Sequence, residues 1–265
     1  MLASRRVRPL TGGWFPNGQN LYMAANERML HHLLDNPVWH ALRGPHARFA
    51  VGRGLALHYQ RDVAAFSAID ESSAQAYADL ALDLPAGTEA RLVRREVDPL
   101  PDGWVEVSRI PLLQMIAGQD DIDPIDGPAV VSLSAAHVAA ASALVDLTKP
   151  GPFGPRTLEM GHYIGVFDEG DESGELLAMA GERMHLPGYI EMSAICTHPK
   201  ARGRRLADYL MRQQMRAAFQ RGERPFLHVL PDNDAAIALY RRLGFEVRSE
   251  MQYLWRKPEA ALIRS

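Results

Sequence analysis

The sequence predicts a mixed α and β fold, in which a smaller N-terminal α/β domain precedes a larger α+β domain. Three observations support this prediction. The chain of 265 residues is too long for one small module and suits two modest domains. Hydrophobic residues make up 47% of it and charged residues 23%, so it should bury ordinary globular cores. Short apolar runs of strand length alternate with amphipathic stretches of helical period.

The overall composition excludes several classes of protein. The net charge of −3 argues against a general nucleic-acid-binding surface, although residues 200–224 carry eight basic side chains and only two acidic ones. The single cysteine, Cys196, excludes an intramolecular disulfide framework and fits a reducing compartment. No apolar run has the length of a transmembrane helix and no secretory signal is recognisable, so a cytoplasmic protein without a membrane partner is expected.

The segment 120–128 is the clearest domain boundary in the sequence. It combines acidic residues with two prolines and a glycine, and it has neither helical nor strand periodicity. We therefore expect a flexible N-terminal arm at 1–20, an N-terminal α/β domain at 21–125 and a C-terminal domain at 126–265.

In the N-terminal domain, the spacing of apolar residues predicts helices at 26–34 and 72–82. Short apolar runs bounded by turn residues predict strands at 48–51, 54–59, 90–97 and 104–107. The chemistry of this half cannot be inferred from its sequence.

The C-terminal domain has a clearer order of elements. Its predicted strands cover 130–133, 162–167, 176–185, 189–197, 226–230 and 246–255. Its predicted helices cover 135–147, 206–220 and 234–243. The last helix is followed by Gly244, and glycine readily takes the left-handed conformation that ends a helix.

A basic loop between strand 189–197 and helix 206–220 is the first candidate for a binding site. Arg202, Arg204 and Arg205 provide positive charge and hydrogen-bond donors, and Gly203 allows the backbone to approach an anion closely. The helix that follows presents unpaired backbone N–H groups and the positive end of its dipole. These features predict a phosphate or pyrophosphate site, and a solvent-facing basic helix start is the alternative.

Two motifs in this region resemble those of the Gcn5-related N-acetyltransferase (GNAT) superfamily, in particular its FR47-like branch. The stretch Arg202-Gly-Arg-Arg-Leu-Ala207 is similar to the family's pyrophosphate loop, Arg/Gln-x-x-Gly-x-Gly/Ala, but Arg205 replaces the middle glycine. The second motif, Asn-x6-Tyr-x3-Gly-Phe, is matched by Asn233, Tyr240, Gly244 and Phe245. The resemblance extends over about residues 128–257.

This resemblance implies the family's fold, a central mixed sheet with two splayed parallel strands and flanking helices. It also implies acetyl-CoA as cosubstrate. The pantetheine arm is expected along strand 191–197, whose splayed partner is 226–230, and the pyrophosphate at the helix start. The residues that it assigns to cofactor binding are Ile195, Cys196, Thr197, Arg202, Gly203, Arg204, Arg205, Leu206, Ala207, Asn233 and Tyr240.

The resemblance implies direct attack by an amine on the acetyl group, with Tyr240 and Glu191 as catalytic residues. Tyr240 would protonate the departing thiolate, and a core aromatic is the alternative. Glu191 lies where several family members carry a general base, and a solvated carboxylate, with water chains as the base, is the alternative. Period-two alternation places Glu191 on one strand face with Ser193, Ile195 and Thr197.

Covalent catalysis and metal chemistry are not expected. Cys196 and His198 have neither an oxyanion loop nor a third partner beside them, so we interpret Cys196 as a small core residue. The ten histidines show no metal-binding spacing.

The predicted function is thus N-acetyl transfer to a small-molecule or peptide amine that the sequence does not identify. The alternatives are a non-catalytic acyl-CoA-binding module and a scaffold that binds partners through the N-terminal half. That half is expected either to cover the acceptor side or, by analogy with duplicated family members, to be a degenerate copy of the family fold.

Overall fold

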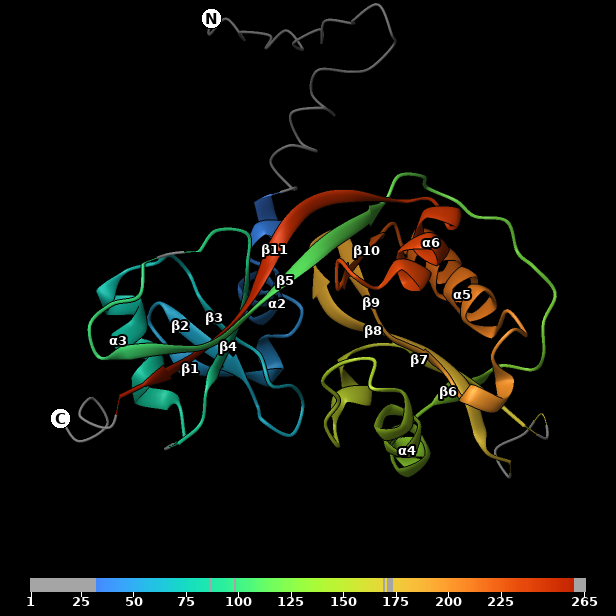
Figure 1. Cartoon of the computed structure of the whole chain (residues 1–265), viewed down its shortest axis with the longest axis horizontal. Helices are drawn as coiled ribbons and strands as arrows, with labels where there is room; N and C mark the ends of the chain where they lie inside the picture. Colours follow the sequence, from blue (N-terminus) through green and yellow to red (C-terminus); the bar gives the residue numbers. More distant parts are fainter. Residues whose placement is uncertain (1–31, 86, 98, 169, 171–173, 260–265) are drawn as a thin grey trace, which may run out of the picture.

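The computed structural model describes residues 32–259, except 86, 98, 169 and 171–173. The expected arm at 1–20 and most of the helix expected at 26–34 lie outside the described residues. Two sheets organise the described chain (Figure 1): a three-stranded sheet of order β1-β2-β3 and an eight-stranded mixed sheet of order β4-β11-β5-β10-β9-β8-β7-β6. The predicted α+β fold with a smaller N-terminal part is confirmed.

The N-terminal part contains two α-helices, α2 (Pro37–Arg43) and α3 (Ala74–Asp83), and the short 3-10 helices η1 (His32–Asp35) and η2 (Ala47–Phe49). Its antiparallel strands are β1 (Ala50–Arg53), β2 (Ala56–Tyr59) and β3 (Ser67–Ile69). Helix α3 begins after Ser73 because the Ser73 side chain accepts a hydrogen bond from the Ala76 amide at 3.1 Å and so satisfies a free N–H of the first turn.

The strands of the large sheet are β4 (Ala90–Arg94), β5 (Trp104–Ala117), β6 (Val131–Leu133), β7 (Tyr163–Phe167), β8 (Leu176–Leu186), β9 (Tyr189–Thr197), β10 (Arg224–Val229) and β11 (Phe245–Pro258). The helices around it are α4 (Val138–Thr148), α5 (Leu206–Gln220), α6 (Asp234–Arg242), η3 (Ala135–His137), η4 (Thr157–Met160) and η5 (Pro199–Ala201). Helix α5 has the predicted bounds, and most other predicted elements of this half differ by one to three residues at their ends.

Strand β5 differs most from the sequence prediction, which placed a strand only at 104–107. It runs for 14 residues and pairs with β11 along its length and with β10 near its end. Pro111 lies in its middle and has no N–H for the ladder, so the strand pattern is interrupted in the sequence. Both β4 and β5 precede segment 120–128, which therefore connects two strands of one sheet.

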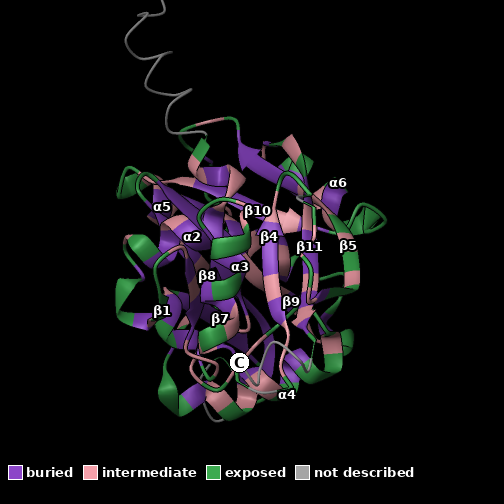
Figure 2. Cartoon of the chain, turned by 90° about the vertical axis from the view of Figure 1, so that its left-hand side faces the viewer, coloured by how far each residue is buried: buried purple, intermediate pink, exposed green. Residues whose placement is uncertain are grey.

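Helices cover both faces of the large sheet. Helices α5 and α6 pack on one face, where Met215 belongs to the same buried cluster as Leu227. Helix α4 packs on the opposite face, where Leu144 contacts the cluster of Tyr163 and Met179. Buried residues are concentrated in the strands, whereas much of α3 is exposed (Figure 2). In the described part of the chain, no helix combines the length and apolar character that a membrane span requires.

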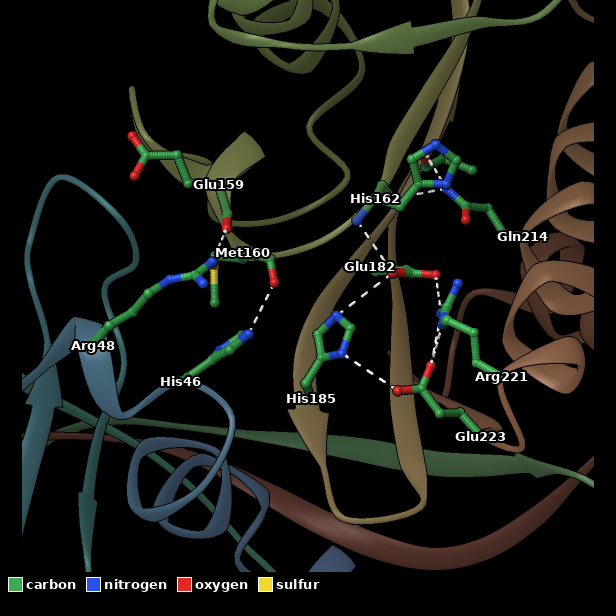
Figure 3. Close-up of polar contacts among 11 residues, drawn as sticks. His46, Arg48, Glu159, Met160, His162, Glu182, His185, Gln214, Arg221 and Glu223 are labelled. Carbon is green, nitrogen blue, oxygen red and sulfur yellow. Dashed lines mark hydrogen bonds and ion pairs between the residues drawn. The ribbon is translucent and has the colours of Figure 1, made fainter.

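Buried polar contacts connect the N-terminal part to the large sheet. The imidazole of His46 lies 2.9 Å from the Met160 carbonyl, which can only accept, so Nε2 carries the proton (Figure 3). Its Nδ1 then accepts a hydrogen bond from the Tyr59 hydroxyl at 2.8 Å. On the sheet side, the His185 ring lies 5.4 Å from that of His46 and faces Glu182 and Glu223 (Figure 3).

Candidate functional site

The parallel strands β9 and β10 pair over three residues and then separate. The last pair joins Phe226 to Glu191, and no further pair between these strands follows in the described residues. From Met192 onward, the β10-facing edge of β9 therefore lacks a ladder partner. Its N–H and C=O groups need partners from another source, such as a ligand or water. These strands are the splayed parallel pair that the family resemblance implies.

A cavity of about 500 Å³ lies where the two strands separate. It is lined by β9 from Met192 to Thr197, by the end of β10, by α6 and by the segment 148–152. The expected cofactor-binding residues that it brings together are Ile195, Cys196, Thr197, Arg202, Asn233 and Tyr240. The other expected residues, 203–207, lie in the adjoining loop and the first turn of α5 and do not line the cavity.

A β-bulge at Ala194 changes the side-chain alternation of β9. Ala194 has a φ of 53°, and the pairing with β8 shifts register between Ser193 and Cys196. Before the bulge, Met192 packs toward α5, and after it Ile195 does so. Glu191 lies on the opposite face from Met192. The expectation that Glu191 and Ile195 share a face is therefore wrong, because the extra residue reverses the alternation.

The basic loop keeps the backbone path that an anion site needs. Gly203 has a φ of 80°, and no other described atom lies within 4 Å of the place where a side chain would begin. Arg205, at the position of the family's glycine, has a φ of 58° and thus the left-handed conformation that favours glycine. This left-handed conformation costs a non-glycine residue such as Arg205 roughly 1 kcal/mol. The loop therefore still delivers the free amides at the start of α5.

Part of the positive charge of this loop is already neutralised. Lys200 contacts Asp168 and Glu175, each at 2.6 Å, and the Arg205 side chain contacts Asp208 at 2.7 Å. Arg202 instead lines the cavity. Arg202 and the α5 N-terminus are consequently the features that best fit a pyrophosphate.

The second motif places Asn233 and Tyr240 beside the cavity. Asn233 begins α6, since its side-chain oxygen accepts a hydrogen bond from the Ala236 amide at 3.2 Å. Tyr240 is only 7% exposed, and burial raises its pKa to about 12, so the phenol is protonated at neutral pH. Gly244 ends the helix with a φ of 85°, at a place where a side chain would collide with Gln119.

Glu191 is fully buried, so the interpretation as a solvated carboxylate is wrong. Arg183 donates from Nε and Nη2 to its two oxygens, both at 2.7 Å, and His228 Nδ1 lies 2.8 Å from Oε1. Burial alone would raise the pKa of Glu191, but the Arg183 charge and these hydrogen bonds hold it at about 2. Arg183 and His228 line the cavity, whereas Glu191 does not. A carboxylate of such low pKa is a weak proton acceptor.

A buried network behind His228 has no signal in the sequence. Gln114 Nε2 lies 3.0 Å from His228 Nε2, and the Gln114 oxygen accepts from Arg248 at 2.6 Å. Arg248 also contacts Asp35 at 2.5 Å. Because Gln114 Nε2 is a donor, His228 Nε2 accepts, and the proton on Nδ1 points to Glu191. These residues come from different elements, so no local motif could reveal them.

Cys196 is buried on the α4 side of the sheet, and burial raises its pKa to about 11. It is therefore a thiol at neutral pH and a poor nucleophile. His198 accepts a hydrogen bond from the Lys200 amide at 3.1 Å and lies 3.4 Å from Glu175. The described residues include no cluster of three or more side chains that could hold a metal ion.

The cavity is also lined by residues that sequence reasoning missed. They are Phe66, Val93, Ile110, Leu112, Arg183 and Tyr253. All six lie outside the recognised motifs: Phe66 precedes β3, and the others lie on β4, β5, β8 and β11 of the large sheet. Apolar residues of this kind look like ordinary core residues in a sequence.

Known proteins resemble this chain in both sequence and structure. Residues 163–255 match the family described as FR47-like protein. A GNAT-family protein from Novosphingobium aromaticivorans DSM 12444 is 36% identical, with a TM-score of 0.76 over 86% of this chain and 99% of that one. A GCN5-related N-acetyltransferase from Kribbella flavida shares the fold, with 23% identity and a TM-score of 0.55 over 85% and 95% of the two chains. A search of curated proteins gave no significant match.

The separated strands, together with these matches, define the class of fold as that of the GNAT acetyltransferases. This fold implies acyl-CoA binding in general. The chain belongs to the GNAT family.

Proposed function

We propose that the protein is an N-acetyltransferase that moves an acetyl group from acetyl-CoA to an amine. One observation carries this proposal: the unpaired edge of β9 lines the same cavity as Arg202, just before α5, and Tyr240 of α6. An extended pantetheine chain can pair with that edge as an added strand does. The amides at the start of α5 can bind the pyrophosphate, with Arg202 beside them.

Each residue in or beside the cavity has a separate role in the proposed reaction. The bound thioester supplies an activated acetyl group, which the acceptor amine takes by direct attack. Tyr240 gives a proton to the departing thiolate, and burial keeps its phenol protonated until then. Glu191 orients Arg183 and His228 and does not itself take the proton of the amine. Water in the cavity takes that proton.

The proposal also covers the class of acceptor and the cellular compartment. The acceptor is a small molecule or a peptide, and neither a nucleic acid nor a membrane takes part. A reducing, cytoplasmic compartment suits the single buried thiol.

Two measurements test the proposal. Titration with coenzyme A in a calorimeter should show binding, and thiol release from acetyl-CoA should accelerate with at least one amine of a panel. Binding without thiol release for any amine would indicate a non-catalytic acyl-CoA-binding module. Absence of binding at millimolar coenzyme A would favour a scaffold, and either result overturns the proposal.

A further inference from the structure

The two ends of the cavity differ in chemistry. The acceptor end is mostly apolar and is formed by Phe66, Val93, Ile110, Leu112 and Tyr253. Among the described residues that line the whole cavity there is no Asp or Glu, and the charged ones are Lys149, Arg183 and Arg202. A polycationic amine finds no carboxylate here. Because Arg202 is assigned to the pyrophosphate, Arg183 is the charged group that lies beside the apolar residues, and it favours an acceptor with a negatively charged or oxygen-bearing group.

Arg183 presents a hydrogen-bond donor to the acceptor end. Its Nε and Nη2 atoms bind Glu191, which leaves Nη1 without a hydrogen-bond partner in the part of the chain that the structure describes. The central carbon of the guanidinium also lies 4.8 Å from the centre of the Phe66 ring. A guanidinium held from two sides can bind another oxygen with little further loss of side-chain freedom.

The hydroxyl of Tyr253 is a second donor at the same end. Tyr253 is 9% exposed, and its hydroxyl makes no hydrogen bond of ordinary length in the described part of the chain. Burial raises its pKa, an effect that the nearby side chains of Arg91 and Trp255 oppose. Because these two groups can only donate, the hydroxyl proton of Tyr253 is left without an acceptor. Its ring packs on the other cavity-lining aromatic, Phe66, with 5.8 Å between the ring centres. Two unused donors thus flank one aromatic ring. Since an unpaired buried donor is costly, this arrangement fits a ligand group with two oxygen atoms.

We propose that the acceptor is an α-amino acid with an apolar side chain, whose carboxylate binds between Arg183 and Tyr253. Its side chain packs against Phe66, Val93, Ile110 and Leu112. This inference rests on the proposed acetyl transfer and specifies its substrate. The nitrogen–acetyl bond forms, the thioester C–S bond breaks, and the proton lost by the amine is balanced by the proton gained by the thiolate. The products are an N-acetylamino acid and coenzyme A.

The first test compares acceptors. We expect kcat/KM for L-phenylalanine to exceed that for phenethylamine by about tenfold or more, because phenethylamine lacks the charged group that Arg183 and Tyr253 bind. Spermidine should be poorer still. If phenethylamine, spermidine or L-phenylalaninamide is acetylated as well as L-phenylalanine, the inference is wrong although the acetyl transfer itself stands. The amide separates a free amino acid from the N-terminus of a peptide.

The second test removes one hydroxyl. Tyr253→Phe should raise KM for L-phenylalanine about tenfold, change kcat by less than about twofold and leave phenethylamine kinetics unaltered. The matched control is Tyr77→Phe, which removes another buried hydroxyl without a partner among the described residues, at a position that does not line the cavity. An equal effect of Tyr253→Phe on both amines contradicts carboxylate binding.

A third measurement separates failure of this inference from failure of the proposed function. If coenzyme A binds but no amine is acetylated, L-phenylalanine is titrated into the protein–coenzyme A complex. Binding that weakens about tenfold in Tyr253→Phe but not in Tyr77→Phe supports the amino-acid site by itself. Absence of binding at millimolar L-phenylalanine overturns it.

Discussion

We expect the buried imidazole of His46 to make the stability of the protein depend on pH. Its imidazole is 2% exposed and lies between the Tyr59 hydroxyl and the Met160 carbonyl, the second of which Figure 3 shows. Burial, aided by repulsion from His185, lowers its pKa from 6.5 to about 4. In the unfolded chain the pKa returns to its ordinary value. Below pH 6.5 the unfolded state therefore binds a proton that the folded state does not.

The size of the effect follows from this difference. Because the pKa of the folded state is depressed, the contribution of His46 is fully present above pH 6.5 and is lost as the pH falls toward 4. The difference in the pKa of His46 between the unfolded and folded states corresponds to about 3 kcal/mol of unfolding free energy. About 2.5 kcal/mol of this stability is lost between pH 7.5 and pH 4.5. For a chain of this size, that loss lowers Tm by roughly 5–10 °C.

The assay is urea denaturation at these two pH values. His46→Gln should be less stable than the wild type at pH 7.5, yet it should lose about 2.5 kcal/mol less on acidification. His58→Gln is the matched control, because it replaces another buried histidine of the N-terminal part of the chain. If His46→Gln loses as much stability in acid as the wild type, the reasoning is refuted.

Three further predictions concern the cofactor site and the reaction. Tyr240→Phe should lower kcat by about tenfold or more and leave the Kd for coenzyme A nearly unchanged, and an unchanged rate with chemistry rate-limiting would remove Tyr240 from the mechanism. Glu191→Gln should destabilise the fold by about 3 kcal/mol, because it leaves the Arg183 charge buried without its partner. The acid limb of its pH–rate profile should stay in place, since Glu191 is already ionised there, and a displaced limb would identify Glu191 as the base. Arg205→Gly should be more stable than Arg205→Ala by about 1 kcal/mol in thermal unfolding, because only glycine relieves the left-handed conformation, and equal stabilities would contradict that strain.

The parts of the site that the sequence predicted are local in the chain. The loop at 202–207 and the start of α5 are consecutive residues, and a glycine beside arginines at a helix N-terminus indicates an anion site without knowledge of any distant contact. Asn233 and Tyr240 were singled out by their resemblance to a family motif, and both belong to one short helix and its cap. Within one loop and helix, local backbone geometry fixes the relative positions of such residues, so distant contacts are not needed to place them.

The environment of Glu191 could not be predicted in this way. Its partners Arg183 and His228 lie on two other strands, and only the pairing of β8, β9 and β10 brings them together. The bulge at Ala194 then separates the face of Glu191 from that of Ile195. A local pattern cannot signal such a change, because a bulge depends on which strand lies alongside.

The sequence by itself predicted the mixed α+β fold and the bounds of α5 from periodicity, caps and glycine positions, all of which act over a few residues. The resemblance of its two motifs to those of GNAT proteins indicated the family and the candidate residues of the cofactor side. Only the tertiary structure decided that β5 completes the central sheet and that Glu191 is buried in an ion pair. It also placed Phe66 and Tyr253 in the lining of the cavity. Contacts of this kind join residues as far apart as Asp35 and Arg248, and burial and pairing across such separations exist only in the folded chain.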